Sequence, residues 1–293
     1  MAAVFIVFMF ILGAILGSFA CCQARRLRFK EKAGKRSANA SKPISPYGRR
    51  SICDHCHKQL KWYENIPIFS WLFFGGRCKK CHKKIGLTEF FSELGLALVF
   101  LALGFKFLPD FETSLTSPDF PWLSFARLLL IIIIFTALAI CFIYDALWGL
   151  LPSVILYILL ALGAIYLVLD FISLPVTASF SLTPNFKTLD IFSFLAGIGI
   201  LPGIYYLLYF FSKEKLVGSG DWLLCLPFAL VLHNFWLCFL VLFLANVLAV
   251  LIQFPATILS KKKSHQFPFG PFLITAFLII YLSQTILYKI AFM

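Results

Sequence analysis

Residues 122–144 read WLSFARLLLIIIIFTALAICFIY, and Asp145 follows them directly. Arg127 is the one charged side chain within this stretch. A run of this length can cross the hydrocarbon core of a bilayer, for which a helix needs about 20 apolar residues. An ionisable group is costly at the end of such a segment, so Asp145 is a candidate functional residue.

Similar apolar runs recur along the rest of the chain. They lie at about 2–24, 90–108, 152–169, 189–211, 222–254 and 271–287. The run at 222–254 is too long for one span, and His233-Asn234 is the expected turn between two shorter ones. With 61% hydrophobic and 13% charged residues, the composition lies outside that of soluble globular proteins. The sequence predicts an all-α polytopic membrane protein with about eight transmembrane helices.

The positive charges of the chain are concentrated in one loop. Of 26 Lys and Arg residues, 17 fall between Arg25 and Lys84, where only Glu31, Asp54 and Glu64 oppose them. Cytoplasmic loops of membrane proteins carry an excess of basic residues, and such clusters also contact anionic lipid. We expect a cytoplasmic loop that contacts membrane lipid, and we do not expect nucleic-acid binding.

The remaining loops give the same orientation. Basic residues recur at 213–215 and 261–263, whereas the loop at 109–121 is acidic. With eight spans, all basic loops fall on one side of the membrane and the acidic loop falls on the other. Asp145 and Asp221, at the ends of the third and fifth spans, are then both expected at the cytoplasmic face.

The basic loop contains two Cys-x2-Cys motifs. They are Cys53-Asp54-His55-Cys56 and Cys78-Lys79-Lys80-Cys81, with 21 residues between them. Four thiolates at such spacing form a closed tetrahedral set suited to structural zinc, and a reducing cytoplasm favours metal over disulfides. The alternative is four free thiols. Because no coordination position is left for water, we expect the metal to hold the loop together and not to catalyse.

The stretch Gly218-Ser219-Gly220-Asp221 supplies a second aspartate near a membrane surface. Gly218 and Gly220 would let the backbone bend or approach another group closely. Two carboxyl groups in one low-dielectric site tend to share a proton, so that one acts as general base on water while the other polarises a scissile carbonyl. The alternative is a helix cap at Asp221 and an ordinary helix-terminal aspartate at Asp145.

Together these motifs resemble the type IV prepilin peptidases, membrane aspartic proteases with a Gly-x-Gly-Asp motif. The resemblance runs nearly end to end. Its segments are Gly17-Ser18-Phe19, Arg26-Leu27, the paired cysteine motifs, Trp62 to Ile68, Ser70-Trp71-Leu72, Glu93, Asp145-x5-Leu151-Pro152, Gly218 to Asp221 and Pro268 to Phe272.

This resemblance implies a function and a division of the chain. It implies cleavage of the leader of type IV pilin-like precursors after a glycine, at the cytoplasmic face of a bacterial membrane, by Asp145 and Asp221. Many members also N-methylate the new N-terminus with S-adenosylmethionine, and Glu93 is a candidate for that step or for positioning the precursor. The expected regions are a first transmembrane helix at 1–24, a cytoplasmic zinc loop at 25–88 and a peptidase core at 89–293.

The chain also departs from the family pattern. Many members carry a second aspartate where this chain has Leu147, a lysine where it has Leu223, and an asparagine where it has Cys21. These departures resemble the competence-pilus enzymes of Gram-positive bacteria more than the secretion-type enzymes. They leave both aspartates intact, so they bear on methylation more than on proteolysis.

Two other functions fit parts of the pattern. Membrane aspartates often mark ion paths, so a proton-coupled transporter is one alternative, although a carrier would more often place them at the bilayer midplane. A non-enzymatic membrane scaffold that recruits a partner through the zinc loop is the other.

Overall fold

The computed structural model describes residues 1–34, 53, 55–56, 58–116, 122–173, 176–177, 189–213, 217–259 and 268–291. Among the described residues, the secondary-structure elements are helices apart from β1 (Val176–Thr177) and β2 (Leu189–Asp190), which form one short parallel pair. The all-α prediction is confirmed. The chain forms two compact units, Met1–Glu112 and Thr113–Met293. The division at residues 24 and 88 follows hydropathy and motifs and stays a prediction.

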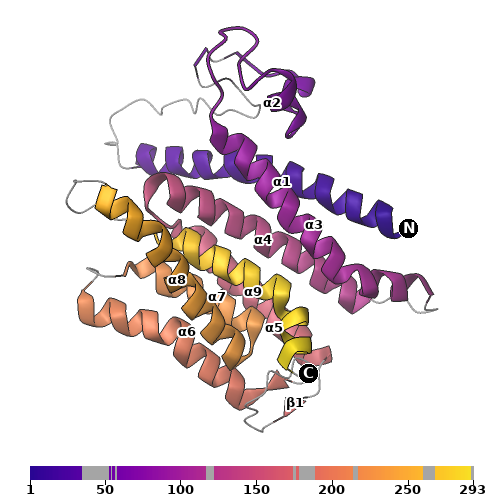
Figure 1. The fold of residues 1–293 in the computed structure, drawn as a ribbon, viewed down its shortest axis with the longest axis vertical. Coiled ribbons are helices and arrows are strands. Elements are labelled where there is room, and N and C mark those ends of the chain that lie inside the picture. The colour runs from indigo at the N-terminus through magenta and orange to yellow at the C-terminus, as the bar shows by residue number, and fades with distance from the viewer. Residues whose placement is uncertain are drawn as a thin grey trace. The chain divides into compact units, whose positions relative to one another are not determined.

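The helices follow the predicted order (Figure 1). The first unit holds α1 (Ala2–Gly34), η1 (Trp62–Asn65), α2 (Phe69–Phe73) and most of α3 (Leu87–Thr116). The second unit holds α4 (Trp122–Trp148), α5 (Ser153–Ser173), α6 (Ile191–Ser212), α7 (Ser219–Leu232), α8 (Phe235–Leu259) and α9 (Gly270–Ala291).

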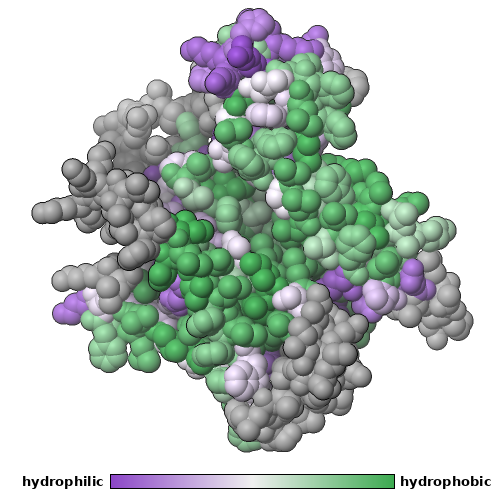
Figure 2. Space-filling model, viewed as in Figure 1, coloured by the Kyte–Doolittle hydropathy of each residue, from purple (hydrophilic) through white to green (hydrophobic). Residues whose placement is uncertain are grey.

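Eight of these helices are apolar and coincide with the predicted spans. In the described part of the chain, six are long and apolar enough to cross a membrane: α1, α3, α4, α5, α6 and α8. The apolar helices at Ser219–Leu232 and Gly270–Gln284 are shorter. Hydrophobic residues cover much of the face in Figure 2, whereas hydrophilic residues gather around the segment that contains α2. The chain is therefore a multi-pass membrane protein.

Two helices extend beyond the apolar runs that predicted them. Helix α1 continues into the basic segment, where Arg28 and Glu31 form an ion pair of 2.9 Å across one turn, a spacing that supports a helix. Helix α3 runs through Pro109 to Thr116, so Asp110 and Glu112 lie in a helix and not in the expected loop. Asp119 lies outside the described residues.

The turn at His233-Asn234 is confirmed. His233 adopts a left-handed conformation (φ 37°) at the end of α7, and its N–H donates to the Ala229 carbonyl at 2.9 Å. Asn234 Oδ1 then accepts the N–H groups of Trp236 and Leu237, at 3.0 and 3.4 Å. One residue ends α7 and the next caps α8, because a left-handed residue ends a helix and an asparagine satisfies the first free N–H groups.

In the first unit, α1 and α3 pack through glycine. A Cβ atom at Gly17 would lie 2.5 Å from the Ser92 carbonyl oxygen and 2.7 Å from the Glu93 Cα atom. A Cβ at Gly13 would come equally close to Leu96 and Phe100, both at 2.7 Å. Small residues let two membrane helices approach closely, so van der Waals contact between backbones holds this pair together.

In the second unit, the short helix α7 packs against α5, α6 and α9 (Figure 1). Aromatic rings fill the interior beside it. Phe228 of α7 stacks on Phe277 of α9 at 4.2 Å, and Phe135 of α4 meets Tyr281 of α9 edge-on at 5.4 Å. These contacts fix α4, α7 and α9 together, and these three helices carry the residues of the candidate site.

The contact at Gly17 can be tested against Gly95, a solvent- or lipid-exposed glycine of α3 whose Cβ would meet nothing within 4 Å among the described residues. We expect Gly17→Ala to destabilise the protein by about 1–3 kcal/mol, because the added methyl overpacks the α1–α3 contact. Gly95→Ala should be neutral or stabilising by up to about 1 kcal/mol, because alanine favours a helix. Thermal unfolding midpoints in detergent measure both, and equal midpoints would contradict the packing role of Gly17.

Candidate active site and metal centre

Asp145 lies in the last turn of α4, inside the second unit. Its side chain is buried, with 4% of its surface exposed. The backbone N–H of Gly270, at the start of α9, donates to Asp145 Oδ2 at 2.9 Å. Gly149 ends α4, and its N–H donates a hydrogen bond to the Asp145 carbonyl at 2.7 Å. Its φ of 62° is a conformation that glycine adopts without strain. The carboxyl group is thus anchored by a second helix as the chain turns away.

Asp221 is the third residue of α7. The Gly218 N–H donates to Asp221 Oδ2 at 3.2 Å, and the Asp221 N–H donates to the Gly218 carbonyl at 3.2 Å. This is the return half of a capping box, in which a carboxylate at the third position accepts the N-cap N–H group. Gly218, and not Asp221, is the N-cap. Asp221 therefore does help to cap α7, but from the third position of the helix and not as its N-cap. The hydrogen bond fixes the Asp221 carboxyl group at the start of the helix.

The two glycines of this motif, Gly218 and Gly220, differ in backbone conformation and in the space around them. Gly218 has an ordinary extended conformation (φ −75°), and its Cβ would meet Asp221 Oδ2 at 3.5 Å, an ordinary contact. A Cβ at Gly220 would lie 2.9 Å from Leu151. Close approach is therefore required at Gly220, as the sequence suggested, while Gly218 contributes its N–H group.

Leu151 joins the two aspartate regions. It lies in the turn between α4 and α5, against Gly220 of α7, and its Cδ2 would be 3.4 Å from a Cβ at Gly270. Gly270 in turn donates to Asp145. Asp145 and Asp221 are also close enough for the charge of Asp145 to act on Asp221. The end of α4 and the starts of α7 and α9 therefore converge, with both carboxyl groups at the convergence.

Sequence reasoning missed two parts of this site. The sequence marks Gly270 only as part of the segment Pro268 to Phe272, which resembles the family. It gives no further sign of the hydrogen bond from Gly270 to Asp145. Tyr205 of α6 was not noted; it is 3% exposed, its hydroxyl accepts the Asn246 amide N–H at 3.1 Å, and Asp221 acts on it electrostatically. A buried hydroxyl needs a hydrogen-bond partner, and Asn246 supplies it.

The four cysteines of the paired motifs meet in the first unit. The sulfur atoms of Cys53, Cys56, Cys78 and Cys81 all lie within 4.8 Å of one another, and none forms a disulfide. The Cys53–Cys81 and Cys56–Cys78 sulfur pairs are each 3.9 Å apart. Tetrahedral coordination with metal–sulfur bonds of ~2.3 Å separates the sulfurs by about 3.8 Å. The cluster has the dimensions of a four-thiolate metal site.

Both cysteine motifs form the same local turn. The Cys53 N–H donates to the Lys58 carbonyl at 2.9 Å, and the Cys78 N–H donates to the Lys83 carbonyl at 3.0 Å, five residues on in each case. Backbone N–H groups of Cys81 and Lys80 point at the Cys78 sulfur and lower the pKa of its thiol to about 6. The thiolate is the form that binds metal, so this turn prepares Cys78 as a ligand.

Glu93 lies in the first unit, in α3, and is buried, with 8% of its surface exposed. It accepts the Ile68 N–H at 2.7 Å, and Ser18 of α1 is a second hydrogen-bond partner. Ile68, the N-cap of α2, has φ 62°, which is unusual for a β-branched residue. The carboxylate of Glu93 therefore anchors the segment between the cysteine motifs at a strained backbone position.

Beside Glu93 is a cavity of about 170 Å³. Residues of α1, the cysteine segment and α3 line it, including Ser18, Arg25, Asn65, Glu89 and Glu93. Arg25 and Glu89 form an ion pair in its wall. Small-molecule sites usually measure at least ~300 Å³. The cavity that the described residues form is smaller than this.

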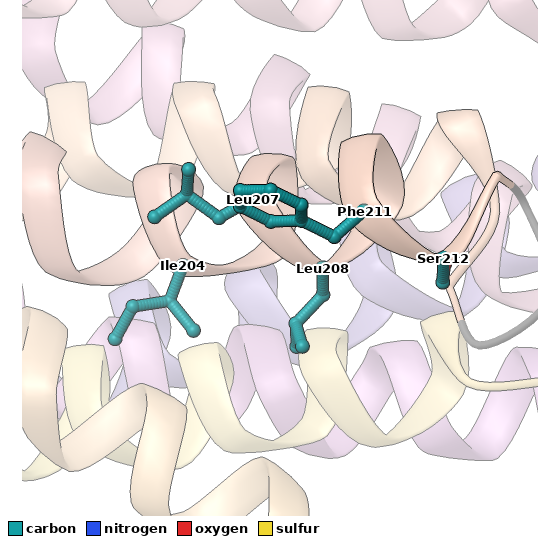
Figure 3. A pocket seen from close by; sticks show the side chains of 5 residues that line it. All are labelled: Ile204, Leu207, Leu208, Phe211 and Ser212. Carbon is teal, nitrogen blue, oxygen red and sulfur yellow. The ribbon is translucent and has the colours of Figure 1, made fainter.

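A second hollow lies on α6 in the second unit (Figure 3). It measures about 290 Å³ and is lined by Ile204, Leu207, Leu208, Phe211 and Ser212. Four of these side chains are hydrocarbon, and Ser212 supplies the one hydroxyl. This surface suits an apolar chain such as a lipid tail, and it offers no acid–base pair for chemistry.

Comparison with known proteins agrees with this organisation. The family description "Bacterial Peptidase A24 N-terminal domain" matches residues 11–107. A prepilin leader peptidase/N-methyltransferase of Dickeya chrysanthemi is 29% identical over 92% of this chain and 89% of its own. The enzyme of the same name from Pseudomonas aeruginosa is 28% identical over 93% and 88%, and that from Vibrio cholerae is 27% identical over 80% and 81%. The chain is thus similar to prepilin leader peptidases over most of its length.

The family match covers the first unit almost entirely. Residues 11–107 include the four cysteines and Glu93, whereas Asp145 and Asp221 lie beyond them. No solved structure matches the chain.

The metal centre can be tested by metal analysis of the purified full chain. We expect about one equivalent of tightly bound metal, because four thiolates complete a tetrahedral site. Cys53→Ser and Cys78→Ser should each lose most of it, whereas Cys22→Ser, a half-buried cysteine of α1 outside the cluster, should retain it. Elemental mass spectrometry measures the content. Equal metal in all three variants would rule out the cluster as the binding site.

Proposed function

We propose that the chain is a membrane aspartic endopeptidase that removes the leader peptide from type IV prepilin-like precursors, with Asp145 and Asp221 as its catalytic pair. The observation that carries this proposal is the convergence of both carboxyl groups at the end of α4 and the start of α7, around Leu151 and Gly270. Relatives across most of the chain bear the name prepilin leader peptidase, and a shorter match is named a type 4 prepilin-like proteins leader peptide-processing enzyme.

The chemistry needs one proton between the two aspartates. The ionised carboxylate accepts a proton from water as the water oxygen bonds to the carbonyl carbon of the scissile peptide, while the protonated partner donates to the carbonyl oxygen. The tetrahedral intermediate then collapses: one of its hydroxyl groups returns a proton to the partner carboxylate, the C–N bond breaks, and the departing amine takes a proton from the carboxyl that acted as base. Gly270 holds one oxygen of Asp145 and Gly218 holds one of Asp221, so both groups keep their orientation through the cycle.

The metal of the cysteine cluster is zinc in this proposal, with Cys53, Cys56, Cys78 and Cys81 as its ligands. Four thiolates suit zinc, and a site closed by four protein ligands leaves no position for water or substrate. Zinc therefore folds the cytoplasmic loop and takes no part in peptide cleavage.

The active site faces the cytoplasm of a bacterial cell in this proposal, because the basic loops mark that side. A precursor leader that is itself basic gains little from a basic loop. Recognition then comes from the apolar helix of the precursor, which packs among the membrane helices of the enzyme. Membrane lipid is a further partner, and nucleic acid is not.

Several relatives are named leader peptidase and N-methyltransferase together. A second activity, transfer of a methyl group from S-adenosylmethionine to the new N-terminal amine, belongs to the same proposal. It is supported by those names, and Glu93 is its candidate residue. Pilus, competence and secretion systems are the assemblies that use such precursors.

The catalytic pair can be tested with Asp145→Asn and Asp221→Asn in membranes that contain a pilin-like precursor. We expect each change to lower the cleavage rate by at least about 10²-fold, because general acid–base catalysis contributes that much or more. The matched control is Asp190→Asn: Asp190 is a buried aspartate of the same unit that caps α6, and asparagine caps equally well. Immunoblotting of precursor and product gives the rates.

The same variants separate the proposal from its alternatives. Processing that continues in both aspartate variants would remove the protease assignment. A scaffold that acts through the zinc loop would remain functional in those variants and fail when the loop is deleted. A transporter would show no precursor cleavage in the wild-type chain.

The role of Glu93 can be tested with Glu93→Gln. Glutamine keeps an oxygen for the Ile68 N–H and removes the charge, so we expect cleavage to stay within about threefold while methylation falls by at least about tenfold if the charge assists methyl transfer. Mass spectrometry of the processed precursor reports the cut site and the added methyl group together. Normal cleavage with normal methylation would remove Glu93 from both steps.

A further inference from the structure

A cluster of ionisable side chains lies inside the second unit, away from the aspartate pair. Arg127 Nε of α4 is 2.9 Å from Asp170 Oδ1 of α5, and His233 Nδ1, at the end of α7, is 3.7 Å from Asp170 Oδ2. The Asp170 side chain is 6% exposed, that of His233 13% and that of Arg127 22%. The cluster therefore joins the consecutive helices α4 and α5 to the end of α7.

Burial of these groups needs a reason. Charged residues in membrane helices are costly and persist where they pair with one another or serve a function. The Arg127 guanidinium and the Asp170 carboxylate bring opposite charges together at 2.9 Å. Removing either partner of a buried ion pair leaves the other uncompensated, which strongly disfavours the arrangement. The pair can therefore hold α4 and α5 in a single register.

The cluster contacts the helices that carry the candidate catalytic groups, at their other ends. Arg127 precedes Asp145 by 18 residues on α4, and His233 follows Asp221 by 12 residues at the end of α7. At 1.5 Å per helical residue, these separations are about 27 and 18 Å. Helix α4 has no proline between these residues, so its continuous backbone hydrogen bonds transmit a shift or rotation from one end to the other. Helix α7 contains Pro227, which removes one such bond, and its placement depends on its packing against α5 and α6.

Helix α9 joins the same network. The hydroxyl groups of Tyr166 on α5 and Tyr281 on α9 are 3.4 Å apart, and both Asp170 and Arg127 act on Tyr281 electrostatically. Helix α9 begins at Gly270, whose N–H holds Asp145. Helices α4 and α7 thus contact this cluster directly, and α9 is linked to it through Tyr166 of α5.

We propose that Arg127, Asp170 and His233 form a positioning element that sets the placement of α4 and α7, and through them the separation of Asp145 and Asp221. The inference rests on the proposed function for its effect on catalysis, and on the structure alone for its effect on the placement of the helices. The three residues act through the aspartates and do not touch the substrate.

The kinetic test uses the full chain in proteoliposomes with a synthetic pilin-like precursor. Arg127→Gln and Asp170→Asn should each lower kcat by about tenfold to 10²-fold, with KM within about twofold, because small displacements of catalytic groups cost rate and not binding. Arg127→Lys keeps the charge, and its kcat should stay within about threefold of wild type. Asp190→Asn is the control for loss of a buried carboxylate from the same unit. Rates are normalised to enzyme that elutes as a monodisperse peak.

The structural test needs no activity. Hydrogen exchange followed by mass spectrometry reports on peptides that contain Gly218 and Gly270, whose N–H groups bond the two aspartates. Asp170→Asn should speed exchange at both sites by at least about threefold, because local opening becomes easier when a distant anchor is lost. Unchanged exchange at both sites would overturn the inference whatever the activity of the chain.

The outcomes separate the inference from the proposed function. A wild-type chain that fails to cleave, with exchange accelerated by Asp170→Asn, supports the positioning element and removes the peptidase assignment. Arg127→Gln as active as Arg127→Lys would overturn the positioning role. If the charge-removing variants do not fold, Asp170→Glu decides: a kcat lowered by about threefold or more at constant KM supports the inference, and an unchanged kcat overturns it.

Discussion

The second unit depends on the length of α7. This helix has 14 residues, about 21 Å, and is too short to cross a hydrocarbon core of ~30 Å. At least one of its ends must therefore be satisfied by protein groups, since the membrane interior offers no water to a free N–H or carbonyl. Asp221 accepts the Gly218 N–H at one end, and the turn at His233-Asn234 serves the other. A short helix thereby brings polar chemistry inside a unit that is otherwise hydrocarbon.

This constraint also explains why the aspartates sit where elements begin and end. A carboxyl group in mid-helix, facing lipid, would have no partner, whereas helix starts offer free N–H groups that stabilise negative charge. Asp221 uses the start of its own helix, and Asp145 uses the N–H of Gly270 at the start of α9. The site is built from the free backbone groups of two helix starts, and the apolar side chain of Leu151 packs against it.

The extent of each helix could be predicted where hydrophobicity alone decides it. The excessive length of the apolar run at 222–254 predicted a turn at His233-Asn234, and the left-handed histidine and capping asparagine are there. Hydropathy failed at Asp110 and Glu112, because a helix that has left the membrane can continue through polar residues. The cysteine spacing predicted a cluster correctly, since two short turns leave four sulfurs little freedom. The Arg127–Asp170 pair joins two helices through residues that are 43 positions apart, and no rule of sequence spacing predicts such a pair.

Glycine illustrates what motif reading leaves open. Gly218 and Gly220 are equivalent as letters of one motif, yet only Gly220 has no space for a side chain, because Leu151 from another turn lies against it. Gly270 is required for the same reason, since a Cβ there would lie 2.6 Å from Asp145 Oδ2. Gly149 differs again, because its φ of 62° ends α4 in open space. Which of these conditions a glycine meets is set by neighbours distant in sequence. The motif thus records a close fit between α7 and the α4–α5 turn, and this fit brings Asp221 to Asp145.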